Sequence, residues 1–144
     1  LEKRHELLEV LVKSINNPKL QLIQELSSPW TIASLKSASN LWPQNELVFV
    51  IGSDLIGDIL KWSEPKAIFQ KSRIAIVPRK GWPLKKIELE KLQVLGGKID
   101  LLELKIPEIS SSDARKTPEI SNVPFPVLKR LLDENLYGVN SHKP

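Results

Sequence analysis

The sequence predicts an α/β protein with a parallel sheet and helices on both of its faces. Short runs rich in β-branched residues alternate with segments whose apolar residues recur at helical spacing. Few residues connect these segments, and 41% of the 144 residues are apolar while 26% are charged, as in globular domains. The length is that of one domain, so we expect residues 1–144 to form a single one.

The N-terminal third predicts two helices and one strand. Apolar residues recur at helical spacing over Leu7–Ile15, and the turn-favouring residues at 16–18 end that helix. Residues 20–26 alternate apolar and polar, which favours a short or edge strand. Thr31–Leu41 again has a helical pattern.

The middle of the chain predicts two buried parallel strands. Glu46–Ile51 is a β-branched run that Gly52 ends, and Arg73–Val77 is a second run that Pro78 ends. Between them, Pro65 occupies the first turn of an expected helix over residues 65–72.

The remaining segments continue the alternation. Ile87–Leu95 predicts a helix that two glycines at 96–97 close, and a strand is expected over Ile99–Leu104. A last helix is expected over Pro126–Asn135. In open sheets of this kind the ligand lies at the carboxyl ends of the strands, so the candidate site residues are sought there.

Composition excludes several classes of function. The chain has no cysteine, which excludes disulfides and thiolate chemistry, and its two histidines, His5 and His142, lie at opposite ends. No apolar run reaches the roughly 18 residues of a membrane span and no signal-peptide pattern opens the chain, so we expect a cytoplasmic protein. The net charge of +4 suits an anionic partner, but the lysines are scattered and no aromatic platform for nucleic acid alternates with them.

Candidate ligand-binding residues follow the first central strand. Gly52-Ser53-Asp54 offers a glycine at which a ligand can approach the backbone and a carboxylate that can accept ribose hydroxyls; the alternative is a turn in which Asp54 caps the next short helix. Trp62, in the loop beyond, either stacks on a planar ring or is half-buried packing.

Two further motifs suit anions. Arg79, in the segment PRKGW, would lie at the sheet's carboxyl edge and suits bidentate phosphate binding, unless this is an exposed basic turn. Ser110 and Asp113 make a capping box, and the hydroxyls with free amides would form an anion site that Arg115 closes, unless they form a plain helix cap.

The order of these motifs resembles that of bacterial nicotinate-nucleotide adenylyltransferases, over nearly the whole chain. ISSSDAR at 109–115 resembles the family's ISSTxIR motif. Ser28-Pro29-Trp30-Thr31 is similar to its SYT segment, and the segment LEKR at 1–4 to its EHR segment.

The resemblance implies a Rossmann-like nucleotidyltransferase fold and transfer of an adenylyl group from ATP, with Mg²⁺, to nicotinate mononucleotide. Trp30 and Thr31 would lie on the nicotinate carboxylate side, Trp62 would stack on its ring and Arg79 would face phosphate. The resemblance assigns further residues to the nucleotides: Gly52 and Asp54 near the sheet edge, Ser110, Ser111 and Arg115 on the ATP phosphates, and Arg4 on the phosphate side.

One family motif has no counterpart in the sequence. Nothing here matches the histidine-containing GxFDPxHxGH segment, so we expect an N-terminal portion to be absent and the 144 residues alone to be inactive. Two alternatives stay open: an adenylyltransferase for another phosphate-bearing acceptor such as phosphopantetheine, and a non-catalytic nucleotide-binding module. Assembly into a homo-oligomer is also left open.

Overall fold

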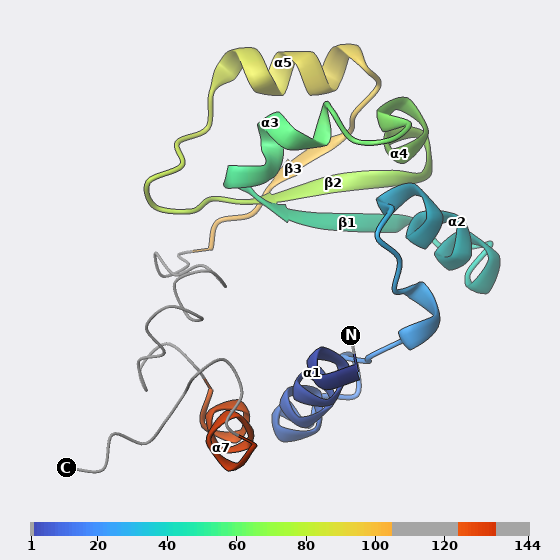
Figure 1. Ribbon diagram of the computed structural model, residues 1–144. Coiled ribbons are helices and arrows are strands. Elements are labelled where there is room, and N and C mark those ends of the chain that lie inside the picture. The colour runs from blue at the N-terminus through green and yellow to red at the C-terminus, as the bar shows by residue number, and fades with distance from the viewer. Residues whose placement is uncertain (1, 105–123, 135–144) are drawn as a thin grey trace. The chain divides into compact units, whose positions relative to one another are not determined.

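The computed structural model describes residues 2–104 and 124–134 (Figure 1). The chain divides into two compact units, one formed by Leu1–Gln24 with Ile109–Pro144 and the other by Glu25–Glu108. The organisation as a single domain stays a prediction.

The second unit contains a parallel sheet of three strands, β1 (Leu47–Gly52), β2 (Ser72–Val77) and β3 (Ile99–Leu101), in the order β1-β2-β3. The register places Gly52 opposite Val77, so the carboxyl ends of β1 and β2 lie at the same edge of the sheet. The predicted parallel sheet with helices is confirmed.

Four helices pack with this sheet: α2 (Thr31–Leu41), α3 (Ile56–Ile59), α4 (Pro65–Lys71) and α5 (Lys86–Val94). In Figure 1, α3, α4 and α5 lie over one face of the strands. Burial of branched apolar side chains stabilises this layer, because each removes a large apolar area from water. The fully buried large side chains are Ile56, Ile59, Ile68, Ile74, Ile76 and Leu92.

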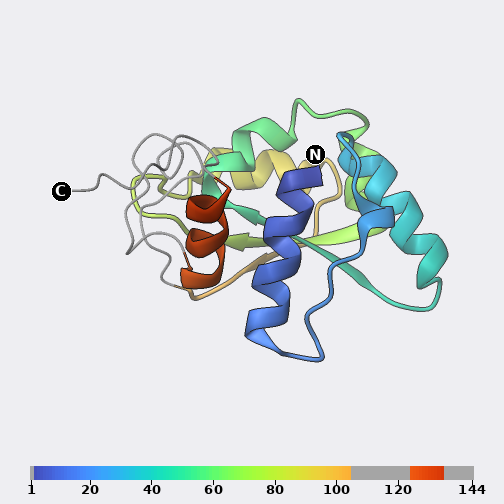
Figure 2. The ribbon, with the colours of Figure 1, turned by 60° about the horizontal axis from the view of Figure 1, so that its bottom comes forward.

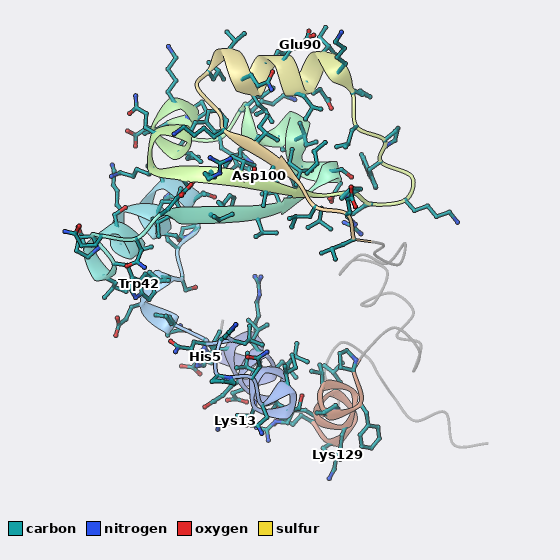
Figure 3. The ribbon with its side chains drawn as sticks, turned by 180° about the vertical axis from the view of Figure 1, so that it is seen from behind. His5, Lys13, Trp42, Glu90, Asp100 and Lys129 are labelled. Atoms are coloured by element: carbon teal, nitrogen blue, oxygen red, sulfur yellow. The ribbon has the colours of Figure 1, made fainter. Side chains whose placement is uncertain are left out.

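Arg73 links the three strands on the sheet's second face. Its guanidinium donates to both carboxylate oxygens of Asp100 on β3, at 2.8 and 2.9 Å, and lies 3.4 Å from the carboxylate of Glu46, just before β1. These hydrogen bonds hold the pKa of the Asp100 carboxyl below its usual value. Asp100 is labelled on the sheet in Figure 3. On the same face, Val48 and Val50 of β1 are more than half exposed.

The C-terminus of α5 is a Schellman motif. The N–H of Gly96 donates to the carbonyl of Gln93, and that of Gly97 to the carbonyl of Leu92, both at 2.9 Å. Gly96 has a φ of +90°, a left-handed conformation that L side chains rarely adopt. The predicted glycine stop of this helix is therefore confirmed.

The first unit contains two helices from opposite ends of the chain, α1 (Glu2–Ile15) and α7 (Phe125–Asp133), which lie side by side (Figure 2). Lys3 of α1 donates to Glu134 at 2.6 Å, and Arg130 of α7 donates to Glu6 at 3.2 Å. These hydrogen bonds raise the pKa of Lys3 and lower that of Glu6. Arg130 also pairs with Glu134 at 2.6 Å, so the four charges form one network.

The expected strand over residues 20–26 is wrong. Residues 20–23 have no regular structure, and Gln24–Leu26 is a short 3-10 helix, η1. The half-buried residues are Leu22, Ile23 and Leu26, a spacing of three to four that suits a helical turn instead of a strand. The hydroxyl of Ser34 on α2 donates to the carbonyl of Leu26 at 2.6 Å and holds this turn.

The third strand is shorter than expected, ending at Leu101 instead of Leu104. After Leu101 one more backbone bond forms, from the N–H of Leu102 to the carbonyl of Ile76. Its neighbour β2 ends at Val77, and Pro78 has no N–H to continue the ladder. Glu103 and Leu104 therefore have no partner strand at this edge.

Among residues 2–104 and 124–134, none of the helices has the length and apolar character that crossing a membrane requires.

Candidate functional site

The carboxyl ends of β1 and β2 are joined through Ser53. This residue follows Gly52 directly and begins the 3-10 helix η2 (Ser53–Leu55). Its hydroxyl oxygen accepts a hydrogen bond from the backbone N–H of Arg79 at 2.9 Å, and the residue is only 6% exposed. Because a buried hydroxyl needs a partner, this bond fixes the start of the loop after β2 against the end of β1.

Asp54 fixes the side chain of Arg79. The Arg79 Nη1 donates to Asp54 Oδ2 at 2.9 Å, and the two side chains are 19% and 22% exposed. Charge-assisted hydrogen bonds of this kind are stronger than neutral ones. Asp54 therefore does not cap a helix, since neither η2 nor α3 has a side-chain cap, and it pairs with the cation predicted to bind phosphate.

The glycine at the end of β1 is required by this arrangement. A Cβ at Gly52 would lie 2.9 Å from Arg79 Cδ and would overlap a carboxylate oxygen of Asp54. The backbone of Gly52 has an ordinary extended conformation, with φ −76°. Glycine is thus favoured here because the Arg79–Asp54 pair occupies the space that a Cβ would need, and not because the backbone requires glycine.

Arg79 begins a tight turn that ends at Trp82. The N–H of Trp82 donates to the carbonyl of Arg79 at 3.0 Å, the two residues form an isolated antiparallel bridge, and Gly81 has a φ of +83°. The Trp82 side chain is 55% exposed. The sequence pattern indicates Arg79 as a site residue but not Trp82; the signal for Trp82 is its position directly after a glycine turn.

Trp62 packs against the sheet. Its ring lies edge-on to that of Phe49 in β1, with centroids 6.2 Å apart and planes at 72°, and it is half-buried against the core. Phe49 stands three residues before Gly52, about 10 Å back along the strand at about 3.3 Å per residue. The structure thus gives Trp62 a packing contact, while stacking of its indole on a ligand ring stays a prediction.

The other predicted site residues belong to other elements or lie outside the described residues. Trp30, 59% exposed, is the N-cap of α2, and Thr31 is its first residue. Arg4 lies on α1, in the other unit. Ser110, Ser111 and Arg115 lie outside the residues that the structure describes.

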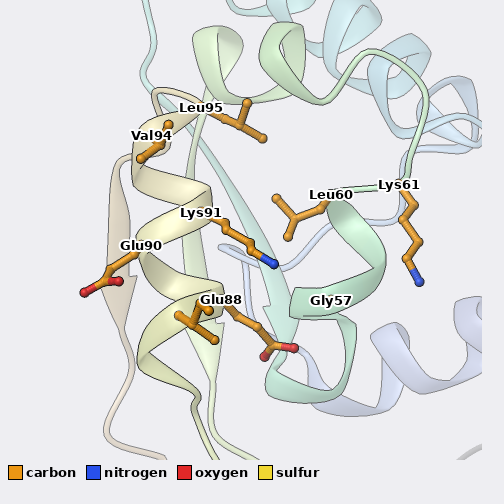
Figure 4. A pocket seen from close by; sticks show the side chains of 9 residues that line it. Gly57, Leu60, Lys61, Glu88, Glu90, Lys91, Val94 and Leu95 are labelled. Atoms are coloured by element: carbon orange, nitrogen blue, oxygen red, sulfur yellow. The ribbon is translucent and has the colours of Figure 1, made fainter.

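A separate open pocket of about 760 Å³ lies between α3 and α5 (Figure 4). Leu60 and Leu95 contribute apolar surface, and the Lys91 side chain extends from α5 toward α3. The predicted site residues do not line this pocket.

The described residues contain no group of three or more His, Asp or Glu side chains that could hold a metal ion. At the sheet edge the carboxylate of Asp54 is engaged by Arg79. His5 lies on α1 (Figure 3), and His142 is outside the described residues.

The fold is a Rossmann-like nucleotidyltransferase fold. Two solved structures of Plasmodium falciparum nicotinic acid mononucleotide adenylyltransferase, one complexed with APC and one with NaAD, superpose with TM-scores of 0.71 and 0.69. Each match covers 97% of this chain, and 77% and 75% of the solved chains, at 24% sequence identity. The predicted fold class is confirmed.

Within this class, the curated relatives are nicotinate-nucleotide adenylyltransferases. A probable nicotinate-nucleotide adenylyltransferase of Synechocystis is 29% identical over 145 aligned residues, which cover 95% of this chain and 72% of the relative. One of Thermus thermophilus is 30% identical over 121 residues, covering 80% of this chain and 59% of the relative. No family model matches the chain. The predicted resemblance is confirmed.

Proposed function

We propose that the protein transfers the adenylyl group of ATP to nicotinate mononucleotide, giving nicotinate adenine dinucleotide and pyrophosphate. The relatives' names support this activity, and so do the solved structures similar in fold, one of which is complexed with NaAD. The observation in this chain that carries the proposal is the fixed Arg79 at the carboxyl edge of the sheet, where ligands of open α/β sheets bind.

The reaction needs no nucleophilic side chain. A phosphate oxygen of nicotinate mononucleotide attacks the α-phosphorus of ATP, a new P–O bond forms, and the bond to the leaving pyrophosphate breaks. The protein's task is to hold two anions in line and to stabilise the charge that develops between them.

Arg79 is suited to this task because it is held before any ligand arrives. Ser53 fixes its backbone and Asp54 fixes its guanidinium. A cation already in place needs no reorganisation as charge develops, which is the basis of electrostatic stabilisation in active sites. We therefore assign Arg79 to a substrate phosphate and Asp54 to the orientation of Arg79.

The remaining roles follow the family resemblance. Thr31 and Trp30 would recognise the nicotinate carboxylate side, and Trp62 would contact its ring. Gly52 would lie near the nucleotide, Arg4 on the phosphate side, and three residues would contact the ATP phosphates: Ser110, Ser111 and Arg115.

Mg²⁺ enters this proposal as the companion of ATP. The described residues offer no cluster of metal ligands, whereas Mg²⁺ in phosphoryl-transfer sites commonly binds substrate phosphates with few protein groups. The metal would neutralise phosphate charge, and we assign it no ligand in this chain. The cytoplasm, where ATP is abundant, is the proposed location.

The test is product formation by protein expressed from its complete coding sequence, with ATP and Mg²⁺. We expect nicotinate adenine dinucleotide from nicotinate mononucleotide, separated chromatographically, and little product from nicotinamide mononucleotide or phosphopantetheine. Arg79→Ala should lower kcat/KM by about 10- to 100-fold, because a charge-assisted contact contributes about 1.5–3 kcal/mol.

Lys85→Ala provides the matched control, since this exposed cation precedes α5 and makes no side-chain cap. Its kcat/KM should stay within about twofold of the unmodified protein, as for a surface substitution away from the site. Absence of dinucleotide product from the folded protein would overturn the proposed function. Preferential use of phosphopantetheine would show that phosphopantetheine, and not nicotinate mononucleotide, is the acceptor.

A further inference from the structure

The exposed indole of Trp82 carries an inference beyond the family comparison. We propose that Trp82 is a ring-contacting, specificity-determining residue: it stacks on the planar ring of the nucleotide whose phosphate Arg79 binds. The inference rests on the proposed function, because it requires a nucleotide at the sheet edge.

The turn holds the backbones of Arg79 and Trp82 close together. Residues 79 and 82 are the first and last residues of a four-residue turn, whose ends lie within about 7 Å. The hydrogen bond from the Trp82 N–H to the Arg79 carbonyl closes this turn, and Gly81 supplies its positive φ. Arg79 is itself bound to Ser53 and Asp54 at the end of β1. Trp82 is therefore tied to the sheet edge through a short chain of hydrogen bonds.

The Trp82 side chain has surface to offer a ligand. It is 55% exposed, whereas the other tryptophan predicted to stack, Trp62, is half-buried and already in contact with Phe49. An exposed indole beside a glycine turn contributes little to a core, so its large apolar area remains for binding.

The residue that begins the turn adds a phosphate contact. Arg79, which we assign to a substrate phosphate, pairs with Trp82 across the turn, so a ligand that reaches both side chains carries a phosphate as well as a ring. The ligand chemistry that fits both features is a planar heteroaromatic ring joined to a phosphate. Pyridine and adenine nucleotides share it, and the experiment separates them.

The test measures dissociation constants by calorimetry for protein from its complete coding sequence. Trp82→Ala should raise the dissociation constant of the ring-bearing nucleotide by about 5- to 100-fold, the range for losing one ring stacked on an aromatic side chain. Trp82→Phe should recover most of this loss. Nicotinate mononucleotide and AMP are titrated separately, and the one whose affinity falls identifies the ring. Ribose 5-phosphate, which has the phosphate and no ring, should bind both proteins equally.

Trp42→Ala is the matched control, because Trp42 is also an exposed tryptophan, 37% exposed, and lies at the other end of α2 from Trp30. It should leave all affinities unchanged. A direct readout compares the quenching of tryptophan fluorescence in the unmodified protein and in Trp82→Phe. The ring-bearing nucleotide should quench the unmodified protein more than the variant, and ribose 5-phosphate should quench both equally.

The outcomes separate this inference from the proposed function. Unchanged affinities in Trp82→Ala, an equal loss for ribose 5-phosphate, or the same quenching in Trp82→Phe as in the unmodified protein would each overturn the role of Trp82. A different result would overturn the proposed adenylyltransferase activity: the absence of dinucleotide product from the unmodified protein.

Discussion

At the residue scale, Gly52 sets the position of Arg79. We expect Gly52→Ala to displace the Arg79 side chain, because the new Cβ would lie 2.9 Å from its Cδ. The flexible side chain can move away, so thermal stability should change little while nucleotide affinity falls by about 10-fold, as for a weakened charge-assisted contact. Calorimetric titration with nicotinate mononucleotide and a melting curve measure the two effects.

Gly57→Ala is the comparison for Gly52→Ala. Its Cβ would meet only the carboxylate end of Glu88, at 3.4 Å, and helix α3 favours alanine over glycine. The affinity of the Gly57→Ala variant for nicotinate mononucleotide should stay unchanged. If both variants lost affinity equally, the contact with Arg79 would not explain the effect at Gly52.

Trp62 is expected to show a cost in stability as well as in substrate binding. Because its half-buried ring packs against Phe49, Trp62→Ala should destabilise the fold by about 1–3 kcal/mol, and Trp62→Phe by less. A double-mutant cycle with Phe49→Ala should give a coupling of about 0.5–1.5 kcal/mol. If Trp62 also stacks on nicotinate, Trp62→Ala raises the KM for nicotinate mononucleotide more than that for ATP. Equal changes in the two KM values would show that Trp62 acts only through packing.

The sequence indicated where Asp54 and Arg79 stand but not that they pair. Each follows a β-branched run that a glycine or proline ends, so both could be placed at the sheet's carboxyl edge. Their contact depends on the register of β1 against β2, which places Gly52 opposite Val77. A single sequence contains no signal for that register, so the sequence alone suggests ribose binding or helix capping for Asp54 and does not indicate the pair with Arg79.

At the scale of elements, the end of α5 depends on two glycines for different reasons. Gly96→Ala should cost about 1–2 kcal/mol because of its left-handed φ, although nothing lies within 4 Å of the added Cβ. At Gly97 the added Cβ would lie 2.8 Å from the backbone oxygen of Leu92, which the helix holds in place. Gly97→Ala should therefore destabilise by a similar or larger amount, measured by urea unfolding. Unchanged midpoints would contradict the cap described above.

The pair of Arg73 and Asp100 should make stability depend on pH. Arg73 lowers the pKa of Asp100 from its usual 3.8, so the folded state favours the ionised carboxyl. The contribution is complete above the unfolded pKa and is lost as the pH falls through the lower, folded pKa. Asp100→Asn should thus lower the melting temperature at pH 7, and the difference should shrink below about pH 4. Glu103→Gln, at an exposed carboxyl after β3, is the control; a difference constant with pH would contradict the pairing.

Most element positions could be predicted because their signals are local. β-branched runs and glycine or proline stops located β1, β2 and α5 to within about a residue or two, which is the scale on which helix-end assignments themselves differ. The strand predicted over residues 20–26 failed because alternation over so few residues also fits a helical turn. The predicted end of β3 was wrong because that end is set by the end of β2, which is distant in the sequence.

At the scale of the whole molecule, Arg130 joins the two ends of the chain. We expect Arg130→Ala to remove the bonds to Glu6 and Glu134 and to speed hydrogen exchange of the α1 amides. Exchange of the buried β2 strand should be unaffected. Lys13→Ala, which removes an ion pair with Glu9 inside α1 only, is the control. Equal protection of α1 in the Arg130 variant and the unmodified chain would show that the network contributes nothing.

The pairing of α1 with α7 also sets an order of events during protein synthesis. α1 leaves the ribosome well before its partner helix, which lies roughly 110 residues later in the chain. At about 5–20 residues per second, α1 waits roughly 5–20 s, while the strands of the sheet have all been made. During that interval the apolar stripe of α1 is without its partner helix. Newly made chains arrested before residue 125 should therefore bind chaperones through this segment, and chains released after α7 should not.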